Sequence, residues 1–422
     1  MVNFIEETIM TSRERVLAAV AHEEADRVPI DQGSMRSSGI MAIAYNRLKT
    51  HLGISGGNTH LYDLVQQLAQ PEDWYLKRFH VDAIDLGRAF TQRDSWQPWT
   101  LPDGSPALAP AWFQPQKKDG GLWAYDKEGT LIGRMPAGCL YVEQACWPLS
   151  HENGVDELEN LPTKMSKVVW AALPTAPFDQ TLTDERLDEI SQVASETCAT
   201  TEYAISVALG CNLLEWSQFL FGMENAYMYM AGEKQKFAYF LDQLADLHMA
   251  SLSRILPKLR GSFQVLVLGD DLGMQKGPQI SRKMYRELFF PRHKRIYEHA
   301  KKLSGAHIFL HSCGGIYELM PDLIEAGVEI FNPVQTNCHN MEPERLKREF
   351  GRDVTFWGGG CDTRDVLPNG TPDQVRDDVR RRMDIFAPGG GFVWAQVHNI
   401  MADIPPANIE AMLEAAAEYG VY

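Results

Sequence analysis

The feature that most constrains the fold of this chain is an alternation of short apolar runs with longer segments of helical periodicity. Eight such runs follow one another, and most are followed by a helical pattern. This alternation is typical of parallel βαβ units, and eight units predict an α/β fold of the (β/α)₈, or TIM barrel, type. The expected strands begin near Arg27, Val81, Tyr203, Phe263, His307, Glu329, Val354 and Phe392.

The chain is longer than such a barrel requires. A (β/α)₈ barrel takes roughly 250 residues, whereas this chain has 422 and shows no internal repeat or linker. We therefore predict one domain over residues 1–422, with the excess in insertions. The largest insertion, at about residues 91–160, follows the second strand, and turn signals such as Pro102-Asp103-Gly104 and Asp119-Gly120-Gly121 predict that it is rich in β-hairpins.

Half of the tryptophans lie in this insertion. They either pack the hairpins onto the barrel or belong to a lid that encloses an apolar or aromatic substrate, and the sequence leaves both interpretations open. The five are Trp96, Trp99, Trp112, Trp123 and Trp147.

The charge and composition of the chain limit the classes of partner and the cellular location that we expect for it. The formal net charge is −16 at pH 7, which argues against nucleic acid or an anionic membrane as a partner. No apolar run approaches the length of about 18 residues that marks a membrane-spanning helix. Residues Met1–Glu7 lack the basic and apolar parts of a signal peptide, and the seven cysteines suggest no disulfide framework. We therefore predict a cytoplasmic protein.

Polar residues follow several of the expected strands. The active sites of parallel barrels lie at the carboxyl ends of the strands, so we expect these side chains to meet at one mouth. The glycine- and serine-rich loop at residues 33–39, which contains Arg36, also offers backbone donors to an anion. The strand-end residues are Asp31, Asp270, Asp271, His311, Cys313, Gln335, Cys361, His398 and Asn399.

The strongest indication of chemistry is the set His311, Cys313 and Cys361. Residues i and i+2 of a strand point to the same face, so His311 and Cys313 can bind one ion. Cys361 follows another apolar run and three glycines. One imidazole and two thiolates with an open fourth position are typical of catalytic zinc. The competing interpretation is a hydrogen-bonded histidine beside two ordinary buried cysteines.

Five segments of the chain together resemble the uroporphyrinogen decarboxylase superfamily. The resemblance extends over most of the chain and is densest in its second half, and the (β/α)₈ fold that it implies agrees with the count of strands. The segments are residues 26–31, 269–273, 311–315, 357–363 and 398–409.

This superfamily contains two chemistries. Its decarboxylases need no cofactor and surround a polyanionic tetrapyrrole with arginines, but the loop after the first strand here offers only Arg36. The other branch contains corrinoid-dependent methyltransferases, similar to the methylcobalamin:coenzyme M methyltransferases and the O-demethylase methyltransferases. These hold zinc with an H-x-C pair and a later cysteine, which His311 and Cys313 match in part.

The third ligand departs from that pattern. In the coenzyme M enzymes it is a cysteine after the last strand, in the stretch that here reads Gly389-Gly390-Gly391 and leads to His398. Cys361, one strand earlier, is the ligand that we predict in its place. His398 is the alternative, and a chain that binds no metal is a third possibility.

The resemblance implies a Zn²⁺-dependent methyltransferase. It would move a methyl group between a small substrate, for which the aromatic insertion favours a methoxylated aromatic compound, and the corrinoid (methylcobalamin) of a separate protein. Residues 246–251 nearly match the corrinoid-binding D-x-H-x-x-G, but serine replaces the glycine and the segment is helical in pattern. We therefore expect the corrinoid on a partner protein.

The expected roles follow from these positions. Catalytic roles in positioning the substrate or donating a proton fall to Asp270, Asp271 and His398. Substrate contacts fall to Asp31, Arg36, Gln335 and Asn399. Two alternatives are a metal-free lyase that acts on a small carboxylated substrate and a non-catalytic carrier of a corrinoid or tetrapyrrole. The sequence does not fix the oligomeric state, and a homodimer is compatible with it.

Overall fold

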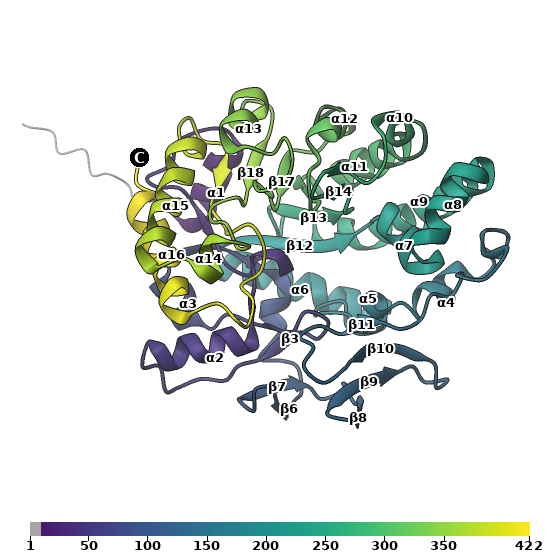
Figure 1. Cartoon of the computed structure of the whole chain (residues 1–422), viewed down its shortest axis with the longest axis horizontal. Helices are drawn as coiled ribbons and strands as arrows, with labels where there is room; N and C mark the ends of the chain where they lie inside the picture. The colour runs from purple at the N-terminus through teal and green to yellow at the C-terminus, as the bar shows by residue number, and fades with distance from the viewer. Residues whose placement is uncertain (1–9) are drawn as a thin grey trace, which may run out of the picture.

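A parallel barrel of eight strands forms the centre of the computed structural model, which describes residues 10–422 (Figure 1). Residues 1–9, which include the segment judged not to be a signal peptide, lie outside the described part. All eight predicted strands are present. In spatial order they are β1 (Ile30–Asp31), β5 (Val81–Asp85), β12 (Ala204–Gly210), β13 (Val265–Gly269), β16 (His307–His311), β17 (Ile330–Asn332), β18 (Thr355–Trp357) and β19 (Phe392–Val393).

Backbone hydrogen bonds between the first and last strands close the barrel. Asp31 N–H donates to the carbonyl of Trp394 and Trp394 N–H donates to the carbonyl of Pro29, both at 2.8 Å. Ile30 also forms a parallel bridge with Trp394. The predicted (β/α)₈ fold is confirmed.

Helices surround the barrel, and two of them begin with capping boxes. In α1 (Ser12–Val20) the box joins Thr11 and Glu14, and in α15 (Pro372–Phe386) it joins Thr371 and Gln374. Each box satisfies backbone N–H groups that a helix start otherwise leaves unpaired. The other helices of this layer are α6 (Asp184–Thr200), α9 (Lys234–Leu259), α11 (Phe290–Ser304), α12 (Met320–Ala326), α13 (Pro343–Phe350) and α16 (Pro406–Tyr419).

Strand alternation divides the core into two layers. On β13, Val265 and Val267 join the cluster inside the barrel, whereas Leu266 and Leu268 pack outward beneath the helices. Inside, Phe309 meets Trp357 edge-on, with ring centroids 5.5 Å apart. The interior is therefore packed, and polar groups gather only at its ends.

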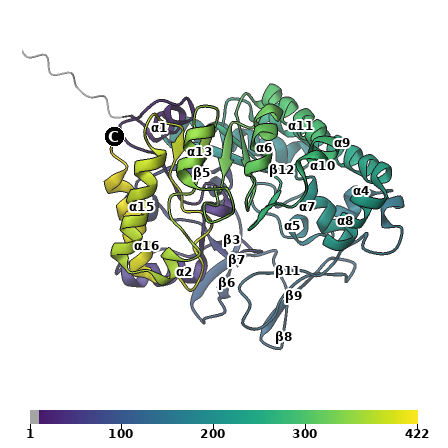
Figure 2. The ribbon, with the colours of Figure 1, turned by 45° about the horizontal axis from the view of Figure 1, so that its top comes forward.

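The predicted insertion after the second strand consists of hairpins, which project from one side of the barrel in Figure 2. The turns at Asp103-Gly104 and Gly120 join the expected neighbouring strands. Trp99 is buried against Phe113, as the packing interpretation predicts, whereas Trp112 and Trp147 are each 42% exposed. The strands are β6 (Trp96–Thr100), β7 (Pro106–Pro110), β8 (Gln116–Lys118), β9 (Gly121–Tyr125), β10 (Leu131–Met135) and β11 (Glu143–Gln144).

A second insertion, between β1 and β5, was not predicted. Between β1 and β5 the chain forms a three-stranded antiparallel sheet and the helix α2 (Ala42–His51). Its strands are only two or three residues long, too short to show an alternating pattern. They are β2 (Ile40–Met41), β4 (Leu68–Ala69) and β3 (Leu61–Asp63).

Shorter elements complete the described part of the chain. Three of them are helices near the first strands of the barrel. Helix α3 (Asp73–Arg78) leads into β5, and α7 (Leu214–Phe221) and α8 (Met223–Gly232) follow β12. No helix of residues 10–422 is long and apolar enough to cross a membrane. The remaining α-helices and strands are α4 (Leu161–Met165), α5 (Val169–Ala172), α10 (Arg282–Met284), α14 (Val366–Asn369), and the hairpin of β14 (Gly273–Met274) with β15 (Gly277–Pro278).

Candidate metal centre

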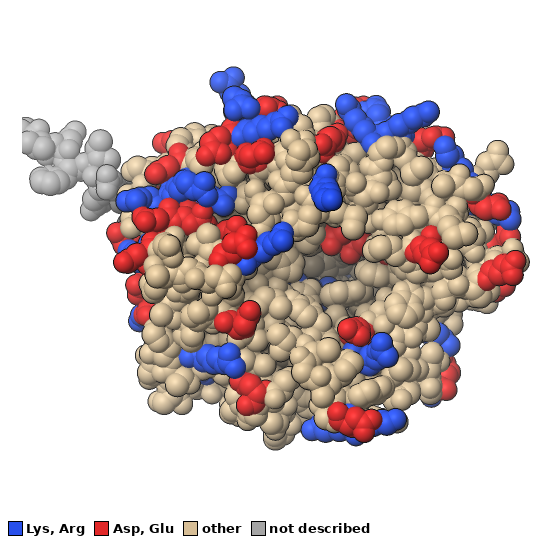
Figure 3. All heavy atoms as spheres, viewed as in Figure 1, with Lys and Arg blue, Asp and Glu red and all other residues tan. Residues whose placement is uncertain are grey.

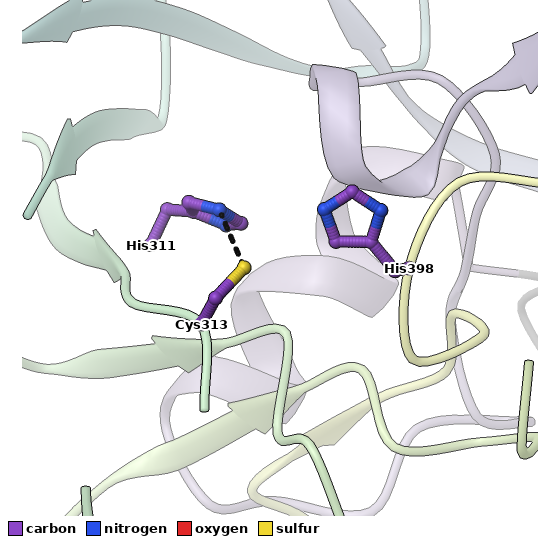
Figure 4. Close-up of side chains that lie close together, drawn as sticks. All are labelled: His311, Cys313 and His398. Carbon is purple, nitrogen blue, oxygen red and sulfur yellow. Dashed lines mark hydrogen bonds between the residues drawn. The ribbon is translucent and has the colours of Figure 1, made fainter. Parts of the chain in front are cut away.

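His311, Cys313 and His398 come together at the carboxyl ends of the barrel strands. One ligand atom of each lies within 4.8 Å of the others, and this is the only such group of three found among residues 10–422. His311 Nε2 is 3.5 Å from Cys313 Sγ, and His398 enters from the opposite side (Figure 4). Figure 3 shows the face of the molecule hollowed near its centre, by the carboxyl end of β12.

The alternation of β16 explains why His311 points into the barrel mouth. Phe309 belongs to the interior cluster, whereas Ile308 and Leu310 pack outward. His311 and Cys313 continue the inward series, two residues at a time. The predicted proximity of these two side chains is confirmed by the distance between them.

Asn332 fixes the tautomer of His311. The two residues are paired in register on β17 and β16, and His311 Nδ1 lies 2.7 Å from Asn332 Oδ1. Asn332 Nδ2 donates to the carbonyl of Trp357 at 2.8 Å, which identifies the other amide atom as the oxygen. His311 Nδ1 must therefore carry a proton, and Nε2 is the ring nitrogen that faces Cys313.

Asn399 holds His398 in the same way. His398 Nδ1 lies 2.7 Å from Asn399 Oδ1, while Asn399 Nδ2 donates to Gln66 Oε1 at 2.6 Å. His398 Nε2 is thus the free nitrogen. Burial lowers the pKa of His398, and the nearby His311 lowers it further. The ring is neutral at pH 7, which is the form that binds metals.

Cys313 lies beside the carboxylate of Asp271. Its backbone N–H donates to Asp271 Oδ1 at 2.7 Å, and that oxygen is 3.7 Å from His311 Nε2. Burial and the charges of Asp271 and Glu215 raise the pKa of the Cys313 thiol well above its usual range. A cation at this position would therefore replace the thiol proton and balance the neighbouring carboxylate.

The structure does not bring Cys361 to this group. Its side chain is fully buried in the outer core, and its thiol lies near the carbonyl of Asp362 and the charged pair Asp378 and Arg382. Trp357 ends β18 facing inward, but the glycines that follow have positive φ values, +128° at Gly358 and +74° at Gly359, and turn the chain outward. The periodicity of the strand therefore does not extend to Cys361.

Two of the predicted carboxylates have structural roles, because buried hydrogen bonds engage their oxygens. Asp270 accepts backbone N–H bonds from Leu213, Leu214 and Glu215 at 2.7 to 3.1 Å and so caps the start of α7. Asp31 accepts from Trp357 Nε1 at 2.8 Å and from the backbone of Ser34 at 2.9 Å. Both are fully buried, and burial raises the pKa of Asp31. Of the three predicted carboxylates, Asp271 alone contacts the metal group.

The remaining predicted residues lie around the mouth. Gln335 Oε1 accepts from Gly314 N–H at 2.8 Å and so holds the loop that follows Cys313. Arg36 pairs with Asp63 and lies over the ring of Trp170, 5.4 Å from its centroid, with 35% of its side chain exposed. Asn399 is buried and binds His398.

Several residues of the site were not predicted from the sequence. Asn332 ends a predicted strand, and that position was the available signal. Glu215 sits in the first turn of α7, where its sequence context gives no signal. Asp271 N–H donates to Glu215 Oε2 at 2.9 Å, and burial together with Asp271 and Asp270 raises the pKa of Glu215 well above its usual range.

Asp85, the last residue of β5, predicts how the stability of the protein changes with pH. Burial raises its pKa from 3.8 to about 7, so the unfolded chain loses this proton at a lower pH than the folded protein, and stability falls between about pH 4 and pH 7. The shift corresponds to at most about 4 kcal/mol, and less here because the side chain is partly exposed. We expect Asp85→Asn to raise the free energy of unfolding at pH 8 by about 1–2 kcal/mol and to leave it unchanged at pH 3.5.

Urea denaturation at the two pH values measures this effect. Asp322→Asn is a control of opposite sign, because Arg282 and Arg286 lower the pKa of Asp322, so that its loss should destabilise the protein at pH 8. An Asp85→Asn variant that is less stable than the native protein at pH 8 would contradict the assignment.

The donor set fits a zinc ion. The Nε2 atoms of two imidazoles and one thiol converge from opposite sides, which matches the three protein ligands of a catalytic zinc site. Each imidazole donates its other N–H to an amide oxygen, the arrangement typical of histidines that bind metals.

Comparison with known proteins agrees with the fold. The uroporphyrinogen decarboxylase (URO-D) family matches residues 201–419, more than half of the chain. The chain therefore belongs to the uroporphyrinogen decarboxylase family.

Two proteins that resemble this chain come from Methanosarcina mazei. Its methylated-thiol–coenzyme M methyltransferase is 29% identical over 161 residues, which span 38% of this chain and only 39% of that protein. A solved methyltransferase structure from M. mazei superposes with a TM-score of 0.53 at 14% identity, covering 97% of this chain and 99% of the other. This second likeness supports the fold.

Proposed function

We propose that the protein is a zinc-dependent methyltransferase that moves a methyl group between a small substrate and the corrinoid of a separate protein. The observation that carries this proposal is the convergence of His311, Cys313 and His398 at the barrel mouth, with both Nδ1 atoms engaged by asparagines. The sequence match to a methyltransferase of the same family supports the reaction class.

Bound zinc would act as a Lewis acid on the heteroatom that releases or accepts the methyl group. The chain's own residues account for the other requirements. Asp271 and Glu215 place two carboxyl groups next to Cys313, and the backbone N–H of Asp271 donates to Glu215 Oε2 at 2.9 Å. In this proposal the pair holds the proton that a leaving alkoxide or phenolate takes up.

The substrate that we propose is a methoxylated aromatic compound. Aromatic groups lie at the mouth from two directions: Tyr141 of the insertion hydrogen-bonds to Asn399, and Trp170 lies beneath Arg36. A methylated thiol is the second substrate to test, because the M. mazei relative carries that name.

The corrinoid must come from another protein in this proposal. The near-match at Asp246–Ser251 lies inside helix α9, where His248 is buried and bonds to the carbonyl of Asn212 at 3.0 Å. A histidine held in this way is not free to bind cobalt. The acidic surface and the reduced cysteines are consistent with a cytoplasmic location.

A direct assay tests the proposal. Zinc-loaded protein is incubated with cob(I)alamin and either a methoxybenzoate or a methylated thiol, and the visible spectrum is followed for methylcob(III)alamin. The expected result is its formation together with one equivalent of the demethylated product. Loss of CO₂ from a carboxylated substrate without zinc would instead favour the lyase, and tight corrinoid binding without any turnover would favour the carrier.

A further inference from the structure

An asparagine side chain holds each of the two histidines of the metal centre. The two asparagines are bonded to different parts of the chain. Each Nδ1 lies 2.7 Å from the Oδ1 of an asparagine. Each asparagine oxygen also accepts a hydrogen bond from a hydroxyl group, and each asparagine nitrogen donates a hydrogen bond to another oxygen. The residues that complete these bonds determine what controls each imidazole.

The asparagine of His311 is anchored inside the barrel. Asn332 accepts from Ser37 Oγ at 2.8 Å and donates to the carbonyl of Trp357 at 2.8 Å. All three residues are buried. The orientation of His311 is therefore fixed by two barrel strands, β17 and β18, and by Ser37 in the buried loop that follows β1.

The asparagine of His398 is anchored outside the barrel. Asn399 donates to Gln66, in the turn between β3 and β4, and accepts from the hydroxyl of Tyr141 at 3.3 Å. Tyr141 lies in the insertion, between β10 and β11. Its hydroxyl is also 3.0 Å from Met401 Sδ.

The two outer segments are joined to each other. Val142 N–H donates to the carbonyl of Val65 at 2.9 Å, so the residues next to Tyr141 and Gln66 form a backbone hydrogen bond. The insertion and the β3–β4 turn are therefore joined to each other, and each forms a hydrogen bond with Asn399.

We propose that Tyr141 and Gln66 are positioning residues through which the hairpin insertion sets the orientation of His398. This inference rests on the proposed function, since it takes His398 as a zinc ligand. Displacement of the insertion from the barrel, for example by a docking partner, would free the Asn399 amide and with it His398. His311 would stay in place, so the insertion controls one ligand of the centre and not the other.

The test is metal binding by the full-length protein, with Co²⁺ as a spectroscopic probe and Zn²⁺ as its competitor. Tyr141→Phe and Gln66→Leu should each weaken binding by about tenfold and change the visible Co²⁺ spectrum. Gln66→Glu retains the acceptor and should bind nearly as the native protein does. Tyr229→Phe is the matched control, because the Tyr229 hydroxyl donates to the carbonyl of His151 at the same 3.3 Å, at an exposed site.

A second readout needs no metal. In protein labelled with ¹⁵N-histidine, NMR reports the tautomer of His398, assigned with His398→Ala, and the Nδ1–H form should lose its dominance in Tyr141→Phe and Gln66→Leu. Native affinity, Co²⁺ spectrum and tautomer in both variants would overturn the inference. A native protein that binds neither ion, with a tautomer that still depends on Tyr141, would defeat the zinc proposal and leave the positioning role intact.

Discussion

Replacing Cys313 by alanine is expected to abolish methyl transfer without unfolding the protein. Cys313 supplies the one thiol of the cluster, 3.5 Å from His311 Nε2, and Lewis-acid stabilisation of a leaving group is worth several kcal/mol. The rate should therefore fall by at least about 1,000-fold. The side chain is small and lies at the rim, so the free energy of unfolding should change by about 1 kcal/mol or less.

The assay for this prediction is the formation of methylcob(III)alamin, with urea denaturation to monitor stability. Cys146→Ala is the matched control, since Cys146 is also half-buried and lies outside the cluster. Equal turnover by the native protein and Cys313→Ala would refute the zinc mechanism.

The second large effect is expected at Asp270, and it is an effect on stability. Its carboxylate accepts three backbone N–H bonds at the start of α7 and lies 3.2 Å from His293 Nε2. Asp270→Ala would leave these buried donors unpaired. We expect a loss of about 3–5 kcal/mol in the free energy of unfolding.

The neighbouring carboxylate provides the comparison. Asp271→Asn keeps an oxygen that can accept from Cys313 N–H, so it should fold normally and lose activity instead. Urea denaturation and the methyl-transfer assay on both variants separate the two roles. A stable but inactive Asp270→Ala variant would restore the catalytic role that the sequence first assigned to Asp270.

The barrel was predictable because it depends on local patterns. Each strand is a short apolar run, and the inward positions of His311 and Cys313 follow from their two-residue spacing within and just beyond one strand. Asn332 could have been found from register alone, as the residue of β17 that is paired with His311.

The rest of the site depends on tertiary contacts that spacing cannot encode. Cys361 was predicted as a ligand by extending a strand through three glycines, two of which have positive φ values and turn the chain. Asp270 and Asp271 are adjacent in sequence, yet one caps α7 and the other contacts Cys313. Tyr141 hydrogen-bonds to Asn399, which lies 258 residues later in the chain, from an insertion in which the tryptophans were the predicted contact residues.

Metal content tests the central claim most directly. Zinc is measured by elemental analysis in the purified native protein and in the His398→Ala and Cys361→Ser variants. We expect about one zinc per native chain, retained in Cys361→Ser and lost in His398→Ala. Zinc lost from Cys361→Ser and retained in His398→Ala, or a native protein that takes up no zinc when incubated with it, would contradict the account.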